Sequence, residues 1–415
     1  MKKIDRLIED RVLKSLESFP AVYIAGPRQS GKTTLAQHIA ATRHQATYIT
    51  FDDLQFRSAA QRDPEAFLRS FDGPVVLDEI QMVPELFRPL KIIIDENRQR
   101  KDGGRGQFLL TGSASVMALP TLSDALVGRM ALHTLLPLSA EEIKSNKRNF
   151  IDNIFLNDWK FEQLAKDNII QVMVNASFPE LLTVKDASLR YEWCNSYINT
   201  LLQRDVRVLM EIEKIGILPD LLQLLAARTG GLLNESSLSS DIEINHVTAK
   251  KYRFLLEGLF LTQTIPAWSR NLGKRLIKAP KVYLSDLNLI SYLLKVDLFD
   301  LPKINPKLFG HVLENFVAVE LLKQLTFSEV RAGLYHYRTA SKQEIDFILE
   351  GPQNQIVGIE VKASSKVDRM DFKQLETLKN DLGKQFRRGF VFYQGNDVVS
   401  FGKEMWAVPI ACLWN

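Results

Sequence analysis

Short apolar runs, separated by amphipathic stretches, mark the first third of the chain. Residues 21–25 (AVYIA), 75–77 (VVL) and 108–110 (FLL) are apolar, and longer stretches of mixed polarity separate them. Runs this short and rich in Val and Ile, with helical stretches between them, are typical of buried parallel strands. The pattern therefore predicts an α/β layer fold with a parallel sheet over residues 1–145.

The hydrophobic pattern changes twice further along the chain. Residues 146–300 are mainly helical in pattern, and LPKINPKLFG (301–310), with two prolines and a glycine, predicts a linker. Beyond it, a helical run (HVLENFVAVELLKQL) precedes three strand-like runs, GLYHYRT, EIDFILEG and IVGIEVKAS, and then another helix and strand. We therefore expect three domains, at 1–145, 146–300 and 301–415.

Composition adds few constraints. The 415 residues are 46% hydrophobic and 25% charged, which is ordinary for globular proteins and excludes a disordered or fibrous chain. Cys194 and Cys412 have no disulfide or zinc-site spacing, so we expect a reducing, cytoplasmic setting. A charged stretch follows the first lysines, unlike a signal peptide, and no apolar run approaches the ~20 residues of a membrane helix. The net charge of +4 decides nothing about nucleic acid.

A phosphate-binding motif follows the first apolar run. Residues 26–33 (GPRQSGKT) match G-x-x-x-x-G-K-[ST], and a helical pattern follows them. A strand that turns into a helix directs backbone N–H groups and the helix dipole at one point, where phosphates bind. Lys32 is expected to reach the β and γ phosphates and Thr33 to bind Mg²⁺; the alternative is a glycine-rich turn that happens to carry a lysine. The expected nucleotide-binding residues here are Gly26, Pro27, Arg28, Gln29, Ser30, Gly31, Lys32, Thr33 and Thr34.

Acidic residues end the next buried run. Asp78 and Glu79 follow Lys32 by 46 and 47 residues (78 minus 32, 79 minus 32). At the end of a strand beside the phosphate loop, Asp78 is expected to lie near the metal. Glu79 is expected to polarise the attacking water as a general base. Alone, an apolar run ending in Asp-Glu also describes a strand with solvated acids at its end.

Two further positions are candidates for contacts with the γ phosphate. Ser113 or Thr111 ends the next strand and is a candidate sensor, the alternative being a turn after a core strand. Arg129 is a candidate for stabilising transition-state charge, within its own subunit or in a neighbouring subunit of a homo-oligomer. The alternative for Arg129 is a structural arginine.

These blocks resemble prokaryotic AAA-type ATPases joined to a C-terminal domain of unknown function with a restriction-endonuclease-like core. The resemblance covers nearly the whole chain and implies a P-loop NTPase sheet, binding of ATP with Mg²⁺, and ATP hydrolysis. The chain departs from the family at Ala176-Ser177, where members often have glycines. The resemblance rests on GPRQSGKTT, LDEIQMVPEL, LLTGSAS, LVGRMALHTLLPLSAEEI, SFPELL, YINTLLQRDVR, LENFVAVEL, EIDFIL and GIEVKAS.

Residues 215–290 resemble a winged helix-turn-helix module. Asn245 is expected to cap a third helix at 246–257, followed by two wing strands. Between His246 and Lys281, eight basic residues stand against one acid, Glu257, a local charge of +7 (eight minus one). Such a patch is suited to DNA phosphates, and equally to a solvated face for protein contacts or ATPase regulation. The eight are Lys250, Lys251, Arg253, Arg270, Lys274, Arg275, Lys278 and Lys281.

Acidic residues on two late strand-like runs suggest a second site. Glu360 and Lys362 are two apart and share a strand face, and Asp346 can face Glu360 if the two strands are adjacent. Carboxylates of this kind suit Mg²⁺, and Lys362 could orient or deprotonate a water that attacks a phosphodiester. Glu314, on the preceding helix, resembles an accessory metal position of the restriction-like fold. The alternative is a retained structural site without activity.

Together these features predict a Mg-ATP-dependent ATPase that acts on DNA, with a nuclease-like domain at its C-terminus. The alternative is a nucleotide-gated switch or scaffold that binds a protein partner and has an inert nuclease-like core.

Overall fold

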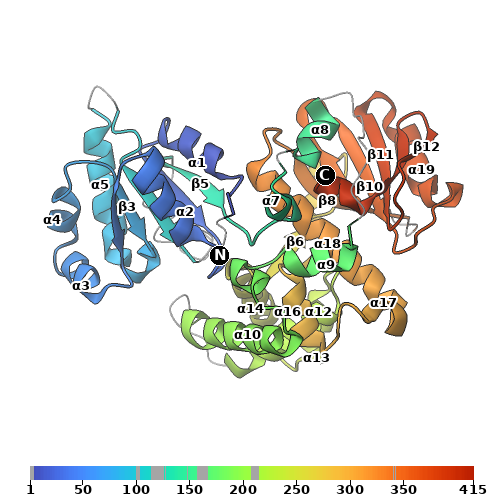
Figure 1. Ribbon diagram of the computed structural model, residues 1–415, viewed down its shortest axis with the longest axis horizontal. Helices are drawn as coiled ribbons and strands as arrows, with labels where there is room; N and C mark the ends of the chain where they lie inside the picture. The colour runs from blue at the N-terminus through green and yellow to red at the C-terminus, as the bar shows by residue number, and fades with distance from the viewer. Residues whose placement is uncertain are drawn as a thin grey trace.

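The computed structural model describes residues 4–99, 103–113, 126, 128–146, 148–156, 167–206, 215–339, 341 and 343–415. The chain forms a blue N-terminal part, a green middle part and an orange-to-red C-terminal part (Figure 1). Among the described residues, no helix combines the length and the apolar character that a membrane span requires.

The N-terminal part is built on a five-stranded sheet in which all paired strands are parallel, with strand order β2-β3-β4-β1-β5. The expected parallel α/β layer is thus confirmed. Buried residues on both sheet faces explain the continuous apolar runs, because helices cover both sides. The strands are β1 (Ala21–Ala25), β2 (Thr47–Thr50), β3 (Val75–Asp78), β4 (Phe108–Gly112) and β5 (Met130–Thr134). The helices are α1 (Glu9–Leu16), α2 (Lys32–His38), η1 (Ile39–Arg43), α3 (Leu54–Arg62), α4 (Pro64–Arg69), η2 (Ile80–Met82), η3 (Pro84–Leu86) and α5 (Phe87–Asn97).

In its described residues, the middle part is helical apart from the antiparallel β6–β7 pair. Three helices, α12 to α14, precede the β6–β7 hairpin, in the order that the sequence predicted. The Asn245 side chain accepts the Thr248 N–H at 2.8 Å, which confirms the expected cap of α14. The elements are α7 (Ala140–Lys144), α8 (Phe150–Leu156), α9 (Ile169–Asn175), η5 (Pro179–Leu182), α10 (Ala187–Thr200), η6 (Leu201–Asp205), η7 (Ile215–Ile217), α12 (Leu218–Ala227), α13 (Glu235–Asp241), α14 (His246–Gly258), β6 (Thr262–Ile265), α15 (Leu272–Ile277), β7 (Lys281–Leu284) and α16 (Leu287–Leu294).

The C-terminal part has a six-stranded mixed sheet in the order β12-β13-β11-β10-β9-β8. α18 packs on one face of the sheet and α19 on the other, each over its own apolar core. The elements are α17 (Leu301–Ile304), α18 (Pro306–Phe327), β8 (Gly333–Arg338), β9 (Glu344–Glu350), η8 (Pro352–Asn354), β10 (Ile356–Val361), η9 (Arg369–Phe372), α19 (Lys373–Leu382), η10 (Gly383–Gln385), β11 (Phe386–Tyr393), β12 (Val399–Gly402), β13 (Met405–Pro409) and η11 (Ile410–Leu413).

The segment 301–310, which the sequence predicted as a linker, is mostly helical. It contains α17 and the first turn of α18. Pro302 and Pro306 stand in first turns, where a missing N–H costs no intrahelical bond. Asn305 then caps α18 by accepting the Leu308 N–H at 3.0 Å. Here the prolines begin helices instead of breaking them.

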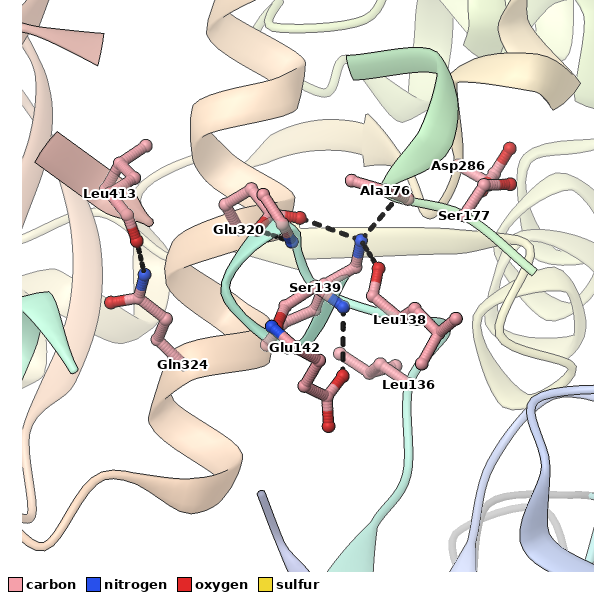
Figure 2. A network of polar contacts seen from close by, with 12 residues as sticks. Leu136, Leu138, Ser139, Glu142, Ala176, Ser177, Asp286, Glu320, Gln324 and Leu413 are labelled. Atoms are coloured by element: carbon pink, nitrogen blue, oxygen red, sulfur yellow. Dashed lines mark hydrogen bonds and ion pairs between the residues drawn. The ribbon is translucent and has the colours of Figure 1, made fainter. Parts of the chain in front are cut away.

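α18 also holds the segment that connects the N-terminal and middle parts (Figure 2). Lys323 is 3% exposed, and its ammonium donates to the carbonyls of Leu138 and Ala176, each at 2.9 Å, and to Glu320 Oε1 at 2.8 Å. The other Glu320 oxygen accepts the Ala140 N–H at 2.8 Å. A buried ion pair on α18 therefore satisfies backbone groups of two different segments.

Candidate active site

The loop between β1 and α2 has a backbone that the sequence motif explains. Gly31 precedes α2 with φ of 95°, a left-handed conformation that favours glycine. A Cβ on Gly26 would lie 2.2 Å from the carbonyl oxygen of Leu135, the residue after β5. The loop therefore passes too close to the end of β5 for any side chain at this position. The Lys32 ammonium donates to the carbonyls of Gly26 and Pro27 at 3.0 and 2.9 Å. The loop thus encircles its own lysine, which fits a phosphate-binding cradle.

Asp78 lies at the end of β3 with hydroxyl groups around it. Its carboxylate is 1% exposed and accepts from Thr33 Oγ1 at 2.9 Å, from the Tyr48 hydroxyl at 2.7 Å, and from the Thr111 hydroxyl. The structure therefore brings Asp78 to Thr33, as expected for a shared Mg²⁺ site. Sequence reasoning missed Tyr48, which follows from no motif. Burial and the bond to Asp78 raise the pKa of Tyr48, so the phenol keeps its proton.

Glu79, the expected general base, is held in place by its neighbours. Its φ of 56° is uncommon for a residue with a side chain, and its N–H donates to Thr111 Oγ1 at 3.1 Å. Its carboxylate accepts from the Gln81 amide, which also donates to Ser113 Oγ at 3.0 Å. Gln81 thus joins the expected base to the expected sensor. Sequence reasoning missed Gln81, although it stands two residues after Glu79.

A cavity of about 570 Å³ opens beside the loop. Arg28, Gln29, Lys32, Thr33 and Glu79 line one side. The opposite wall comes from the middle part, chiefly from α10. It includes Trp193, Ser196, Tyr197 and Thr200.

Aromatic side chains build the α10 wall. The rings of Trp193 and Tyr197 stack with centroids 5.0 Å apart and planes at 8°. The Tyr197 hydroxyl donates to the Arg28 carbonyl at 3.3 Å, a direct contact between α10 and the loop. The sequence predicted a helix here, but its cavity-facing residues carry no motif chemistry that would have placed them at the site. The middle part is therefore a wall of the site.

A second cavity of about 120 Å³ lies on another side of Gly31, with Arg6 among its lining residues. Arg6 donates to the Ser30 carbonyl and the Leu136 carbonyl, each at 2.6 Å, and to Glu142 at 2.9 Å. The Glu142 carboxylate also accepts the Ser139 N–H, closing the capping box of α7 (Figure 2). Arg6 thus connects the phosphate loop to the segment that α18 holds. The lining residues are Ile4, Arg6, Glu9, Gly31, Thr34, Leu35, His38, Leu138 and Pro179.

Arg129 is not brought to this site. It is absent from the residues that line the larger cavity. Its guanidinium instead binds the Asp95 carboxylate through two bonds of 2.7 and 2.8 Å. The bond from Arg129 lowers the pKa of Asp95. In this structure Arg129 has a structural contact at the end of α5, and its role in hydrolysis stays a prediction.

Five of the eight basic residues around the β6–β7 hairpin bind carboxylates or carbonyls within the chain. The cationic groups of the buried Arg253 and of Arg275 pair with carboxylates, while others bind carbonyls. A cation that is already bound offers less to a DNA phosphate. The five are Arg253 (with Glu235 and Glu257), Arg270 (with the Asp381 carbonyl), Arg275 (with Glu350), Lys278 (with the Arg338 carbonyl) and Lys281 (with Glu314 and Glu344).

The two strands that carry the predicted carboxylate site in the C-terminal part are adjacent, which is the condition under which Asp346 can face Glu360. β9 and β10 pair antiparallel, and the Val361 N–H donates to Asp346 Oδ2 at 2.8 Å. Glu360 is buried, and burial followed by the Asp346 charge raises its pKa well above the usual range. Lys362 lies 3.8 Å from Glu360 and 3.7 Å from Asp371. Within the described parts of the chain, no group of three or more His, Cys, Asp or Glu side chains is arranged to hold a metal ion.

The N-terminal part is similar to a known family. Residues 18–144 match the family model described as an AAA domain. The N-terminal part is therefore similar to AAA domains. Its phosphate loop, its parallel sheet and Asp78 at the end of β3 agree with that assignment. Residues 166–300 and 309–413 match two domains of unknown function, DUF8612 and DUF4143.

Most of the chain is similar to an uncharacterized protein. The uncharacterized protein Rv2008c of Mycobacterium tuberculosis (strain H37Rv) is 27% identical over 355 residues, covering 86% of this chain and 73% of the relative. Among solved structures, the Walker-type ATPase PABY2304 of Pyrococcus abyssi is similar at 14% identity and a TM-score of 0.40, covering 71% of this chain and 96% of that one. The Thermotoga maritima RuvB Holliday junction branch migration motor is similar at 18% identity and a TM-score of 0.29. The match covers 62% of this chain and 89% of that one. The AAA assignment rests on the family model.

Proposed function

We propose that the AAA domain hydrolyses ATP with Mg²⁺ and that the middle part responds to the nucleotide. The observation that carries this proposal is the buried Asp78 carboxylate, which accepts from Thr33 of the phosphate loop and stands next to Glu79. The residues fit MgATP, because hydroxyl and carboxylate oxygens meet beside a glycine cradle that leaves no room for a side chain at Gly26.

Each residue then has a defined task. Lys32 exchanges its two loop carbonyls for the β and γ phosphates, and the N–H groups at the start of α2 bind the same phosphates. Thr33 and Asp78 would hold Mg²⁺, which neutralises the negative charge of the phosphates. Glu79 orients the attacking water and accepts its proton, while Gln81 and Ser113 fix the direction of its carboxylate. The smaller cavity, with Leu35, Leu138 and Pro179 in its wall, is suited to the base.

A paired substitution tests this proposal. Lys32→Ala should abolish ATP binding, since the loop loses its only lysine. Glu79→Gln should keep binding but reduce hydrolysis by about 10²–10⁴-fold, the usual contribution of a general base. Glu85→Gln is the matched control, because Glu85 is an exposed glutamate on the same segment. Equal turnover by Glu79→Gln and Glu85→Gln would rule out the general-base role.

Of the two downstream roles, the contacts favour a nucleotide-gated switch that binds a protein partner. α10 forms a wall of the nucleotide cavity, and most of the basic patch is engaged inside the chain. Action on DNA, with cleavage by the C-terminal part, is the second candidate, and it depends on Lys250, Lys251 and Lys274. ATPase activity measured with duplex DNA separates the two roles. Stimulation that disappears at high salt and in Lys274→Glu would favour DNA, and unchanged activity would favour the switch.

A further inference from the structure

A lysine of the middle part is buried among the carboxylates of the C-terminal part. Lys281 is the first residue of β7, and its side chain is 2% exposed. Its ammonium lies 2.9 Å from Glu314 Oε1 on α18, 2.7 Å from Glu344 Oε1 on β9, and 3.8 Å from Asp346 Oδ1. Two of the three carboxylates, Glu314 and Asp346, belong to residues that the sequence analysis predicted as metal ligands. A cation from the same chain is therefore in contact with the predicted metal site.

The middle part encloses Glu314 from more than one direction. The Tyr283 hydroxyl, two residues after Lys281, donates to Glu314 Oε1 at 2.7 Å. Gly230 has φ of 73°, and a Cβ there would lie 3.2 Å from the other Glu314 oxygen. Leu232, in the same turn, forms a β-bridge to Lys281. The turn and β7 thus form one pocket for this carboxylate, with a hydroxyl donor and a cation in place.

The charges of the cluster need a buried cation. Glu314, Glu344 and Asp346 bring three carboxylates to one buried ammonium. The remaining charged groups that face the cluster are Glu360, Lys362 and Arg338, which lies 3.4 Å from Glu344. An ammonium at this position offsets the repulsion between the carboxylates.

The arrangement suits an ammonium better than a divalent metal. Mg²⁺ requires oxygens at about 2.0–2.1 Å in octahedral geometry, whereas an ammonium binds oxygens through three donors at hydrogen-bond distance. Lys281 has such distances to Glu314 and Glu344. The described residues contain no three-ligand metal group, in agreement with this reading. The residues present do not fit the metal that the restriction-like fold would imply.

We propose that the Glu314–Glu344–Asp346 cluster takes the Lys281 ammonium as its cation in place of a divalent metal, and that this contact ties the β6–β7 hairpin to the C-terminal sheet. The cluster then joins two domains and does not cut phosphodiesters. This proposal is independent of ATP hydrolysis, because none of these residues lines the nucleotide cavities.

Chemical rescue tests this proposal. Lys281→Ala removes three methylenes and the ammonium, and leaves a space shaped for n-propylammonium. We expect the Tm of the full chain to fall by on the order of 10 °C, since breaking a buried ion pair is strongly destabilising. Millimolar n-propylammonium should restore most of this loss, while n-propanol and Mn²⁺ should not. Lys278→Ala is the matched control, because Lys278 binds a carbonyl and no carboxylate, and it should show no rescue.

A second measurement keeps the test decisive if Lys281→Ala fails to fold. Mn²⁺ is titrated into the nucleotide-free wild-type protein and into Asp346→Asn by calorimetry. The proposal expects the same titration curve for both proteins. A Mn²⁺ site in the wild type that disappears in Asp346→Asn would overturn the proposal, as would restoration of the Lys281→Ala Tm by Mn²⁺. ATP turnover in the same samples is scored separately and is expected to be retained.

Discussion

Replacing Lys323 by methionine tests how α18 holds the connecting segment. Lys323→Met keeps the length of the side chain but removes a buried ammonium that makes three bonds, to Leu138, Ala176 and Glu320. Two carbonyls then lose a donor, and Glu320, which is 0% exposed, loses its cation. Breaking a buried pair from one side costs about 3–5 kcal/mol. We expect a destabilisation of about 3 kcal/mol at pH 8, measured by urea unfolding of the full chain.

The pH dependence of this effect has a definite sign. Burial raises the pKa of Glu320 in the folded chain, and Lys323 opposes that rise. An acid whose folded pKa is raised holds its proton longer in the folded state, so its destabilising effect develops as pH rises from the unfolded pKa to the folded pKa. Lys323→Met raises the folded pKa further, so the stability difference from wild type should be smallest near pH 5 and should grow towards pH 8.

The double variant Lys323→Met with Glu320→Gln provides the control. It removes both charges and leaves an amide oxygen for the Ala140 N–H, so it should recover much of the loss and flatten the pH dependence. Substitutions at surface sites usually change the free energy of unfolding by less than about 0.5 kcal/mol. If Lys323→Met changes it by no more than this at pH 8, the reasoning is refuted.

Three further predictions concern the nucleotide site and the cysteines. Gln81→Leu should lower ATP turnover by roughly tenfold or more with unchanged nucleotide affinity, because Glu79 loses its restraint; the exposed Gln55→Leu is the control, and equal kcat in the two variants would contradict the role. ATP binding should change the fluorescence of Trp193, which lines the cavity, and the change should be absent in Trp193→Phe; an unchanged signal would argue against the α10 wall. Burial raises the pKa of the Cys194 and Cys412 thiols, so both should react slowly with a thiol reagent in the native protein at pH 8 and rapidly in urea; fast native labelling would contradict the packing.

Much of the nucleotide site was readable from the sequence because its chemistry is local. The phosphate loop lies in eight consecutive residues, 26–33, and Asp78 and Glu79 end one strand. In a parallel sheet the carboxyl ends of strands meet at one edge, so β1 and β3 bring these groups together once the sheet forms. The sequence left the adjacency of β9 and β10 as a condition, and the structure pairs these two strands antiparallel.

Other residues at these sites came from packing between distant segments. Tyr48, Gln81 and the α10 aromatic residues have no motif, and only the folded chain brings them to Asp78, Glu79 and Arg28. Arg129 matched a motif position, yet its side chain has a partner, Asp95, that no spacing rule selects.

The sequence by itself determined the parallel sheet of the N-terminal part and the phosphate loop, because hydrophobic periodicity and glycine conformation act over a few residues. Only the tertiary structure decided that α10 forms a wall of the nucleotide cavity and that Lys281 enters the Glu314 cluster. These contacts join residues that are far apart in the chain, and their partners are selected by shape and charge after the elements have packed.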